Sequence, residues 1–360
     1  SIISFVLAGY LKKKARSNEA ALKYVVYGGF SSGIMLFGLS YIFGLTGSTN
    51  IFEIQQAVSK LDPASSTALT LAILMVLAGF GYKISAVPFH FWTPDVYEGA
   101  PLSITAYLSV APKAAAFALM IRFFNQTFAD GGAMKGLDSV SLTQLPWPEI
   151  LSILSVATMT LGNVVALQQK SIKRMLAYSS IAHAGYMLLA MPVMSGDSIY
   201  AIMMYLVMYL FMNLGAFFVV IIVKNKTGGE SFDDYKGLGW EMPFVGAAMT
   251  LFMVSLTGLP PTAGFIGKFY IFASLIKGGS TYYWLVVIGG INSVVSLYYY
   301  LKVVKVMYFE GERTDKILFP SNVLTGTLIF TAVPSLFLGI YWNPIASWIQ
   351  NSLVFFTQNL

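Results

Sequence analysis

The 360-residue sequence contains no cysteine, only two histidines and few charges, with 11% of its residues being Asp, Glu, Lys or Arg. The lack of cysteine excludes disulfide bonds, thiolate-held zinc and iron–sulfur clusters in this chain. Soluble domains carry about 25% charged residues, whereas 56% of this chain is hydrophobic and its mean hydropathy is +0.69. Several apolar runs reach about 18 residues or more, the length that crosses a bilayer as a helix. The composition therefore predicts an all-α, polytopic transmembrane bundle in the lipid bilayer.

Other familiar signals are absent as well. There is no Walker motif and no dinucleotide-binding glycine pattern, and no stretch has metal-ligand spacing. The net charge of +6 does not indicate a nucleic-acid partner, because the basic residues lie in short loops between apolar runs. The opening stretch, SIISFVLAGYLKKKAR, is too short to span and has neither the basic start nor the cleavage-type end of a signal peptide. We expect it to be the last half of a helix that begins upstream.

The apolar runs predict ten spans within a single transmembrane domain that covers 1–360. They are 1–11 (partial), 20–45, 66–87, 102–124, 148–168, 175–194, 198–223, 243–276, 282–306 and 322–343. The tail that follows, to residue 360, has the amphipathic pattern of an interfacial helix.

The basic residues lie mostly in alternate loops, which supports this count. The loops after the first, fifth, seventh and ninth spans, with the adjoining helix ends, hold fourteen: Lys12, Lys13, Lys14, Arg16, Lys170, Lys173, Arg174, Lys224, Lys226, Lys236, Lys302, Lys305, Arg313 and Lys316. The opposite side holds four: Lys60, Arg122, Lys135 and Lys277. Cytoplasmic loops are enriched in Lys and Arg, so the odd-numbered loops are predicted to face the cytoplasm.

Prolines interrupt two of the spans. Pro88 and Pro94 follow the third span in FGYKISAVPFHFWTPDVYEGAP, and the eighth contains TGLPPTAG, from Thr257 to Gly264. Proline lacks the backbone N–H and clashes with the preceding turn, so both helices must break there. The broken spans are five apart and cross in opposite directions, which is typical of inverted-repeat transporters. We therefore expect inverted five-helix repeats with two discontinuous helices: 1–124 ends the first repeat, 148–306 forms the second, and 322–360 is the last span and tail.

Four lysines lie inside predicted spans: Lys23, Lys83, Lys113 and Lys268. No Asp or Glu lies near the middle of any span. Ionisable residues at membrane depth usually mark ion pathways, and desolvation makes an ammonium group easier to deprotonate. Lys83, Lys113 and Lys268 are therefore candidate members of a proton relay. Lys23 lies near the cytoplasmic end of its span, where snorkelling to the interface is as good an explanation as function.

The two histidines differ in their surroundings. His183 lies mid-span, with Tyr178, Ser179, Ser180 and Tyr186 nearby in the sequence, and a neutral imidazole can pass a proton between its nitrogens. Auxiliary proton transfer and simple helix packing are equally good interpretations of it. His90 lies beside Pro88 near the end of the third span and is interpreted as a structural loop residue.

Four motifs together resemble a known family. KISAVPFHFWTPDVYEGAP, APKAAAF, SIKRMLAYSSIAHAGY and GLPPTAGFIGKFY are similar to the subunit N family of bacterial NADH–quinone oxidoreductase, respiratory complex I, which has mitochondrial and chloroplast relatives. The resemblance covers essentially the whole chain. The FHFWTPDVYEGAP stretch separates this family from the sister antiporter-like subunits.

The resemblance implies a fourteen-helix, proton-translocating subunit of the bacterial inner membrane, with about four further helices upstream. By motif match, Lys83 and Lys268 resemble the lysines of the two discontinuous helices, and Lys113 the central lysine. Lys23 is similar to a modulating lysine, whose glutamate partner would lie just before Ser1, within reach of Lys23 or Lys83. No redox centre is expected here: NADH, FMN, iron–sulfur clusters and quinone would belong to partner subunits, which include the sister antiporter-like subunits.

Three alternatives remain open from the residues alone. The first is a subunit of a multisubunit cation/proton antiporter, which shares the repeat fold, and the second is a structural membrane subunit of a hydrogenase-type complex. A small-solute carrier is disfavoured, because no span holds a carboxylate and the lysines are spread over several spans.

Overall fold

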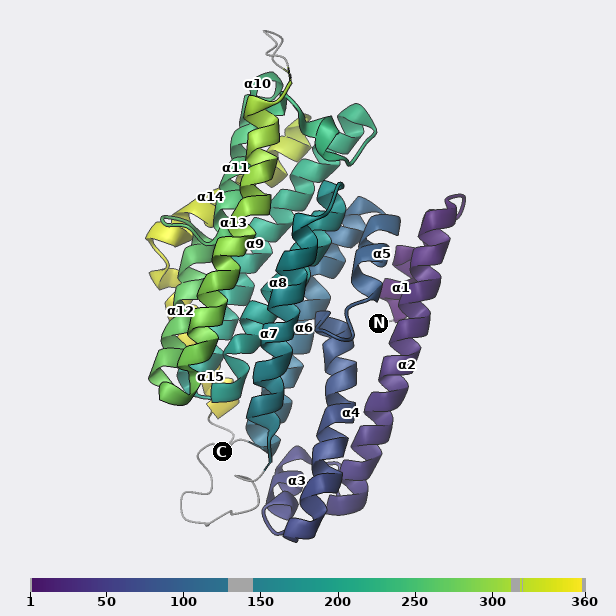
Figure 1. The fold of residues 1–360 in the computed structure, drawn as a ribbon, viewed down its shortest axis with the longest axis vertical. Helices are drawn as coiled ribbons and strands as arrows, with labels where there is room; N and C mark the ends of the chain where they lie inside the picture. The colour runs from purple at the N-terminus through teal and green to yellow at the C-terminus, as the bar shows by residue number, and fades with distance from the viewer. Residues whose placement is uncertain (1, 129–144, 312–317, 319, 358–360) are drawn as a thin grey trace.

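The computed structural model of the chain describes residues 2–128, 145–311, 318 and 320–357. These residues form a bundle of long helices that run roughly along one axis (Figure 1). In the described part of the chain, extended pairing is limited to an isolated bridge between Ser171 and Ser231.

The helices follow one another along the chain. Their bounds are α1 Ile2–Ala8, α2 Ala15–Thr46, α3 Ile51–Val58, α4 Ser66–Ile84, α5 Trp92–Gly99, α6 Leu102–Thr127, α7 Trp147–Leu167, α8 Ile172–Leu189, α9 Gly196–Thr227, α10 Leu238–Glu241, α11 Pro243–Thr257, α12 Ala263–Lys277, α13 Tyr283–Phe309, α14 Asn322–Ile340 and α15 Asn343–Thr357. Single 3₁₀ turns occur at η1 Pro63–Ser65, η3 Met191–Val193, η4 Phe232–Tyr235 and η5 Ser280–Tyr282.

Eight helices in the described ranges are long and apolar enough to cross a membrane. There are nine if Phe232–Glu241 and Pro243–Thr257, which meet at a bend of 120°, are counted together as one span. The eight correspond to the second to seventh, ninth and tenth predicted spans. The other two predicted runs are not single long helices. The first contains only the short helix α1, which ends at Ala8. The eighth, in which a break was predicted, is divided into α11 and α12, of 15 residues each.

Many of the helix ends lie toward one of the two ends of the bundle, whereas α4 ends part-way along it, at the first break (Figure 1). In Figure 1, α5, α10 and the turn between α1 and α2 lie toward the upper end, and α3 lies at the lower end. The upper group includes the basic turn that holds Lys12 and Lys13. This arrangement agrees with the two sets of loops that the charge pattern separates.

Both predicted breaks are present. α4 ends where Ser85 takes a left-handed conformation (φ 65°), and α11 ends at Gly258 (φ 87°) before Pro260 and Pro261. A left-handed residue directly after the last turn is a common helix stop. The chain passes the first break upward, from α4 to α5, and the second downward, from α11 to α12 (Figure 1).

Helix α8 is the most enclosed of the long helices, with 89% of its most apolar stretch buried. Glycines allow α7 to approach it closely. A Cβ atom built on Gly185 would lie 2.5 Å from the backbone nitrogen of Met159, and one on Gly162 would lie 2.6 Å from that of Ala182. The tail forms α15, which buries Ile349 in a small cluster with Met204 and Met208 of α9.

Replacing Gly185 by alanine should loosen the bundle at this contact. The added methyl group overlaps the α7 backbone, and overpacking of this kind costs about 1 to 3 kcal/mol. We expect a lower thermal midpoint for the detergent-solubilised protein. Gly290→Ala is the matched control, because nothing lies within 4 Å of a Cβ atom at that helical position and alanine favours a helix over glycine. Equal midpoints for the two variants would contradict the packing argument.

Candidate functional site

Lys113 lies inside the bundle on α6, with only 1% of its surface exposed. Its ammonium group donates hydrogen bonds to the hydroxyl oxygen of Ser180 at 2.5 Å and to the Ser180 carbonyl at 3.0 Å. Both acceptors belong to α8. Among the described residues, no ion pair of Lys113 with a carboxylate is present. The charge is therefore met by neutral oxygen atoms, which bind an ammonium group without fixing its proton as a carboxylate does.

Lys268 lies just after the second break, on α12, and is 4% exposed. Its ammonium group donates to the carbonyl of Thr257 at 2.8 Å, a carbonyl at the very end of α11, and to the Ser293 hydroxyl at 3.2 Å. It also lies 4.2 Å from the centre of the Tyr186 ring, within the range of a cation–π contact. The break thus supplies a hydrogen-bond acceptor to the lysine. In return, the lysine donates to a carbonyl that lipid has no donor to satisfy.

His183 lies on α8 and is 1% exposed. Its Nδ1 is 2.7 Å from the Tyr205 hydroxyl and its Nε2 is 3.0 Å from the Tyr300 hydroxyl. Tyr300 also forms a short hydrogen bond with the Ser179 hydroxyl. A neutral imidazole donates through one nitrogen and accepts through the other, so two hydroxyl partners match it fully. The sequence predicted hydroxyl groups near this ring, and hydroxyl groups do bind it. They belong to tyrosines of α9 and α13, however, and not to the neighbouring residues of α8.

One face of α8 connects the two lysines. Ser180, His183 and Tyr186 are three residues apart, a spacing that puts them in a row on a helix. Ser180 accepts from Lys113, and the Tyr186 ring lies under Lys268. The His183 ring lies between them in the row, with its centre 5.9 Å from that of Tyr186. The three side chains place a row of polar groups on one face of α8 between the two lysines.

Two buried asparagines extend this line on the side of Lys268. The Ser293 hydroxyl is 3.3 Å from the Tyr186 hydroxyl, which is in turn 3.4 Å from Asn163 Nδ2. Asn163 also bonds to Asn292 at 3.1 Å and accepts from Tyr299 at 2.9 Å. Sequence reasoning missed these asparagines, although an amide in the middle of an apolar run is itself a signal.

Lys83 lies at the last turn of α4, beside the first break. Its ammonium group is 5.5 Å, 5.6 Å and 5.3 Å from the ring centres of Phe5, Tyr24 and Tyr82. The faces of three aromatic rings carry negative potential that favours a cation. Lys83 also lines a cavity of about 370 Å³ between α2, α4 and α6. Its surroundings differ from those of the other two lysines, which are bound by oxygen atoms.

Lys23 is separate from the buried line. It forms ion pairs with Glu19 and with Asp95, both at 2.7 Å, and its side chain is 36% exposed. Lys23 thus has two carboxylate partners inside this sequence that sequence reasoning missed, while the glutamate expected before Ser1 stays a prediction. Glu19 could have been found, because it is four residues earlier on the same helix. Asp95 could not, since its contact depends on how α5 packs against α2.

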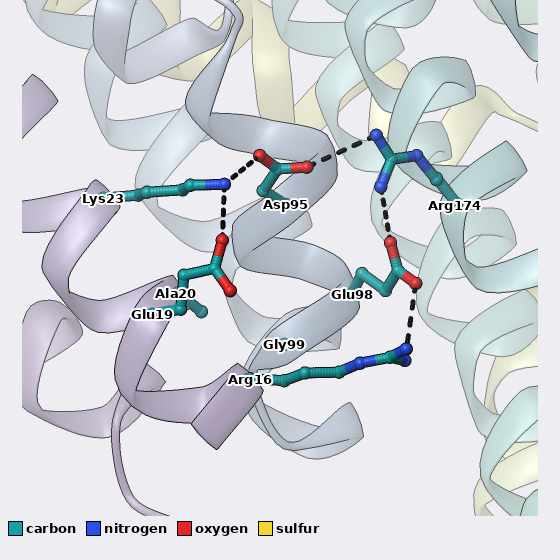
Figure 2. A pocket seen from close by; sticks show the side chains of 8 residues that line it. All are labelled: Arg16, Glu19, Ala20, Lys23, Asp95, Glu98, Gly99 and Arg174. Carbon is teal, nitrogen blue, oxygen red and sulfur yellow. Dashed lines mark hydrogen bonds and ion pairs between the residues drawn. The ribbon is translucent and has the colours of Figure 1, made fainter. Parts of the chain in front are cut away.

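Ion pairs continue from Lys23 across to α8 (Figure 2). Arg174 binds Asp95 at 3.3 Å and Glu98 at 2.5 Å, and Glu98 reaches Arg16 at 3.8 Å. These side chains line a pocket of about 230 Å³. The row Glu19, Lys23, Asp95, Arg174, Glu98 and Arg16, named here the charge ladder, alternates in sign from one residue to the next.

Neither histidine is part of a metal site in the described ranges, where no group of three or more His, Cys, Asp or Glu side chains is placed to hold a metal ion. His90 is 5% exposed, and its Nδ1 has no hydrogen-bond partner in the structure. It is more deeply buried than its interpretation as a loop residue suggested.

Comparisons with known proteins agree on one family. The sequence profile described as "NADH:quinone oxidoreductase/Mrp antiporter, TM" matches residues 1–296. NADH-quinone oxidoreductase subunit N 2 of Sorangium cellulosum (strain So ce56) is 50% identical over 98% of this chain and 70% of that protein. A chain of respiratory complex I from Thermus thermophilus superposes with a TM-score of 0.76 at 31% identity, covering 96% of this chain and 71% of that one. The Mrp complex from Dietzia sp. DQ12-45-1b has the same fold, with a TM-score of 0.81 at 19% identity over 98% of this chain and 71% of that chain.

His183→Leu should destabilise the bundle. The substitution leaves the Tyr205 and Tyr300 hydroxyls without their imidazole partner, and a buried group that loses its partner costs about 1 to 3 kcal/mol. We expect a thermal midpoint clearly below that of His90→Leu, because His90 has no hydrogen bond at Nδ1 and gives up only a contact with the Pro88 backbone. If His183→Leu and His90→Leu have the same thermal midpoint, the contacts of His183 with Tyr205 and Tyr300 do not contribute to stability.

Proposed function

The chain belongs to the subunit N family of NADH-quinone oxidoreductases, and from this we propose a path by which it translocates protons within the membrane arm of complex I. The path uses Lys83, Lys113 and Lys268 as proton carriers, with His183 as a link and Lys23 as an auxiliary group. Other subunits carry the electrons, so this chain's part is to take up, hold and release protons.

The single observation that supports this proposal most is the polar row on α8. Lys113 and Lys268 are far apart in sequence and lie on different helices, and both contact the same face of α8, at Ser180 and Tyr186. A proton that leaves one ammonium group meets hydroxyl and imidazole groups on the way to the other. Hydrogen-bonded hydroxyls and a neutral imidazole can each accept a proton on one side and give one up on the other.

His183 is suited to the middle of this path. It bonds to Tyr205 through one nitrogen and Tyr300 through the other. If a proton arrives at the unprotonated nitrogen, the other nitrogen can release its own, and the ring is left as the other tautomer until its hydroxyl partners exchange protons with it again. Tyr300 extends this link to Ser179, the residue next to the Ser180 that Lys113 contacts.

Lys83 is proposed as the carrier of the first half. It lies beside the break between α4 and α5 and lines a cavity that also includes Pro112, the residue before Lys113. The cavity is wide enough for several water molecules, since each occupies about 30 Å³ in the liquid. Water in this space would connect Lys83 to the α6 segment that carries Lys113.

The two breaks support an inverted repeat. The chain crosses them in opposite directions (Figure 1), as a rotation about an axis in the membrane plane requires. On this view 1–124 ends the first repeat, 148–306 forms the second, and 322–360 adds the last span and tail. Rotation preserves chain order, so Lys83, which precedes its break, and Lys268, which follows its own, are not equivalent positions.

The rest of the complex supplies the redox chemistry. We propose that NADH, FMN, iron–sulfur clusters and quinone belong to partner subunits and that sister antiporter-like subunits adjoin this one in the bacterial inner membrane. The alternative of a cation/proton antiporter or hydrogenase-type subunit loses support from the 50% identity to a subunit N protein. Similarity to the Mrp complex at 19% identity concerns the fold alone.

Lys113→Ala and Lys268→Ala should each abolish most of the proton pumping that this subunit contributes. Loss of a proton-transfer group costs on the order of a hundredfold in rate, while the helices around it remain in place. The measurement is acidification of inverted vesicles that contain assembled mutant complex, per electron passed from NADH to quinone. Lys60→Ala, at an exposed position in a loop, is the control. Full pumping by both buried-site variants would contradict the path.

Lys113→Arg should fail to pump as well, although it keeps the positive charge. A guanidinium group stays protonated and cannot release its proton, so a conductive path needs the amine itself. The same vesicle assay, with complex assembly checked by electrophoresis of the intact membrane arm, decides the matter. Wild-type pumping by the arginine variant would mean that the charge at this position, rather than its titration, matters.

A further inference from the structure

The short helix α5 contacts the surroundings of Lys83 through its first turn. Trp92 Nε1 donates to the Tyr82 carbonyl at 2.9 Å, and the Trp92 ring stacks on Tyr24 with centres 4.5 Å apart. Thr93 donates to the Ser85 hydroxyl at 2.7 Å. Tyr24 and Tyr82 are two of the three rings around the Lys83 ammonium group. The position of α5 therefore sets both the break and the aromatic rings around this lysine.

The other half of α5 is held by charge. Asp95 binds Lys23 of α2 at 2.7 Å and Arg174 of α8 at 3.3 Å. Glu98, one turn further on, binds Arg174 at 2.5 Å and Arg16 at 3.8 Å. Figure 2 shows both carboxylates of α5 between a cation of α2 and the guanidinium group of α8.

The charge ladder is not suited to binding an anion. Its three cations, Arg16, Lys23 and Arg174, each already contact a carboxylate of the ladder. An added phosphate or carboxylate would have to displace Asp95, Glu98 or Glu19. The ladder is neutral as a whole, which indicates a structural or positioning role.

We infer that Asp95 is a positioning residue for proton transfer at Lys83: with Glu98, it clamps α5 between α2 and α8 and so holds the rings and the break around the lysine. This inference rests on the function proposed above. An eight-residue helix has little stability by itself, and α5 is separated from α4 by the break, so its position depends on contacts with its neighbours. Asp95 supplies two of these contacts from one carboxylate.

The size of the expected effect follows from the exposure of the pairs. The side chains of Asp95 and Lys23 are about one-third exposed, and exposed pairs contribute little individually. Loss of both pairs of Asp95 should therefore leave the fold intact while α5 moves away from its position more often. The substitution should change the geometry at Lys83 before it changes the assembly of the complex.

The experiment compares Asp95→Asn with Asp95→Glu and with Asp197→Asn in the assembled complex. Asp197 pairs with Lys277 at 2.9 Å near the opposite end of the bundle and serves as the matched loss of one carboxylate. Pumped protons per electron are measured in inverted vesicles. We expect a reduced ratio for Asp95→Asn, recovery of most of it in Asp95→Glu, which keeps the charge, and no change for Asp197→Asn.

A thiol reporter measures the break itself. The 360 residues contain no cysteine, so Ala86→Cys adds a single thiol to these residues, at a position that is 1% exposed, and the same subunit without Ala86→Cys gives the background labelling. The rate of maleimide labelling, read on this subunit after separation, should rise by about threefold or more when Asp95→Asn is added, the change expected for loss of a partly exposed pair. It should stay the same when Asp197→Asn is added.

The outcomes distinguish two hypotheses: that Asp95 holds α5 in position, and that Lys83 carries protons. Lys83→Ala is measured beside the other variants, and full pumping by it would remove Lys83 from the proposed function. If Lys83→Ala fails while Asp95→Asn pumps and labels as the parent does, the clamp alone is wrong. If Asp95→Asn loses pumping with unchanged labelling, Asp95 acts by another means than holding α5, and the inference is overturned.

Discussion

Among the described residues, the interior of this bundle holds the ammonium groups of Lys113 and Lys268 without a carboxylate paired to either. An isolated charge in a medium of low dielectric constant is costly, so the chain surrounds each amine with weaker partners. Lys113 has a hydroxyl and a carbonyl of α8, Lys268 has a carbonyl at the end of α11, and Lys83 has three aromatic faces. In the proposed path, partners of this kind would stabilise the charge and still allow a proton to leave.

The helix breaks follow from the same constraint. Within a continuous helix the carbonyls already accept from the helix backbone, as the Ser180 carbonyl does when it also binds Lys113, whereas a break releases carbonyls that have no helical partner. At the second break the Thr257 carbonyl accepts from Lys268. At the first break, the Tyr82 carbonyl accepts from Trp92, and the Lys83 ammonium group contacts aromatic rings instead of a carbonyl. The charged pairs of the chain lie instead toward the ends of the bundle, where the charge ladder joins α2, α5 and α8.

Sequence reasoning identified the buried lysines, both breaks and the family, because each of these is a local signal: a charge in an apolar run, a proline in a helix, or a motif. It divided the chain correctly into eight of the long helices and placed the loops on two sides. It missed the partners of His183 on α9 and α13 and the pairing of Lys23 with Asp95. Those contacts join residues 22, 117 and 72 positions apart, and they depend on which faces of the helices meet, which no single stretch of sequence records.

The central claim is that the buried lysines change their protonation state while the complex turns over. Isotope-edited infrared difference spectroscopy of the assembled complex, with ¹⁵N-labelled lysine in this subunit, measures this directly. The account predicts ammonium bands that disappear and return during electron transfer from NADH to quinone and that are lost in a Lys113→Ala complex. Lysine bands that stay constant throughout turnover would contradict it.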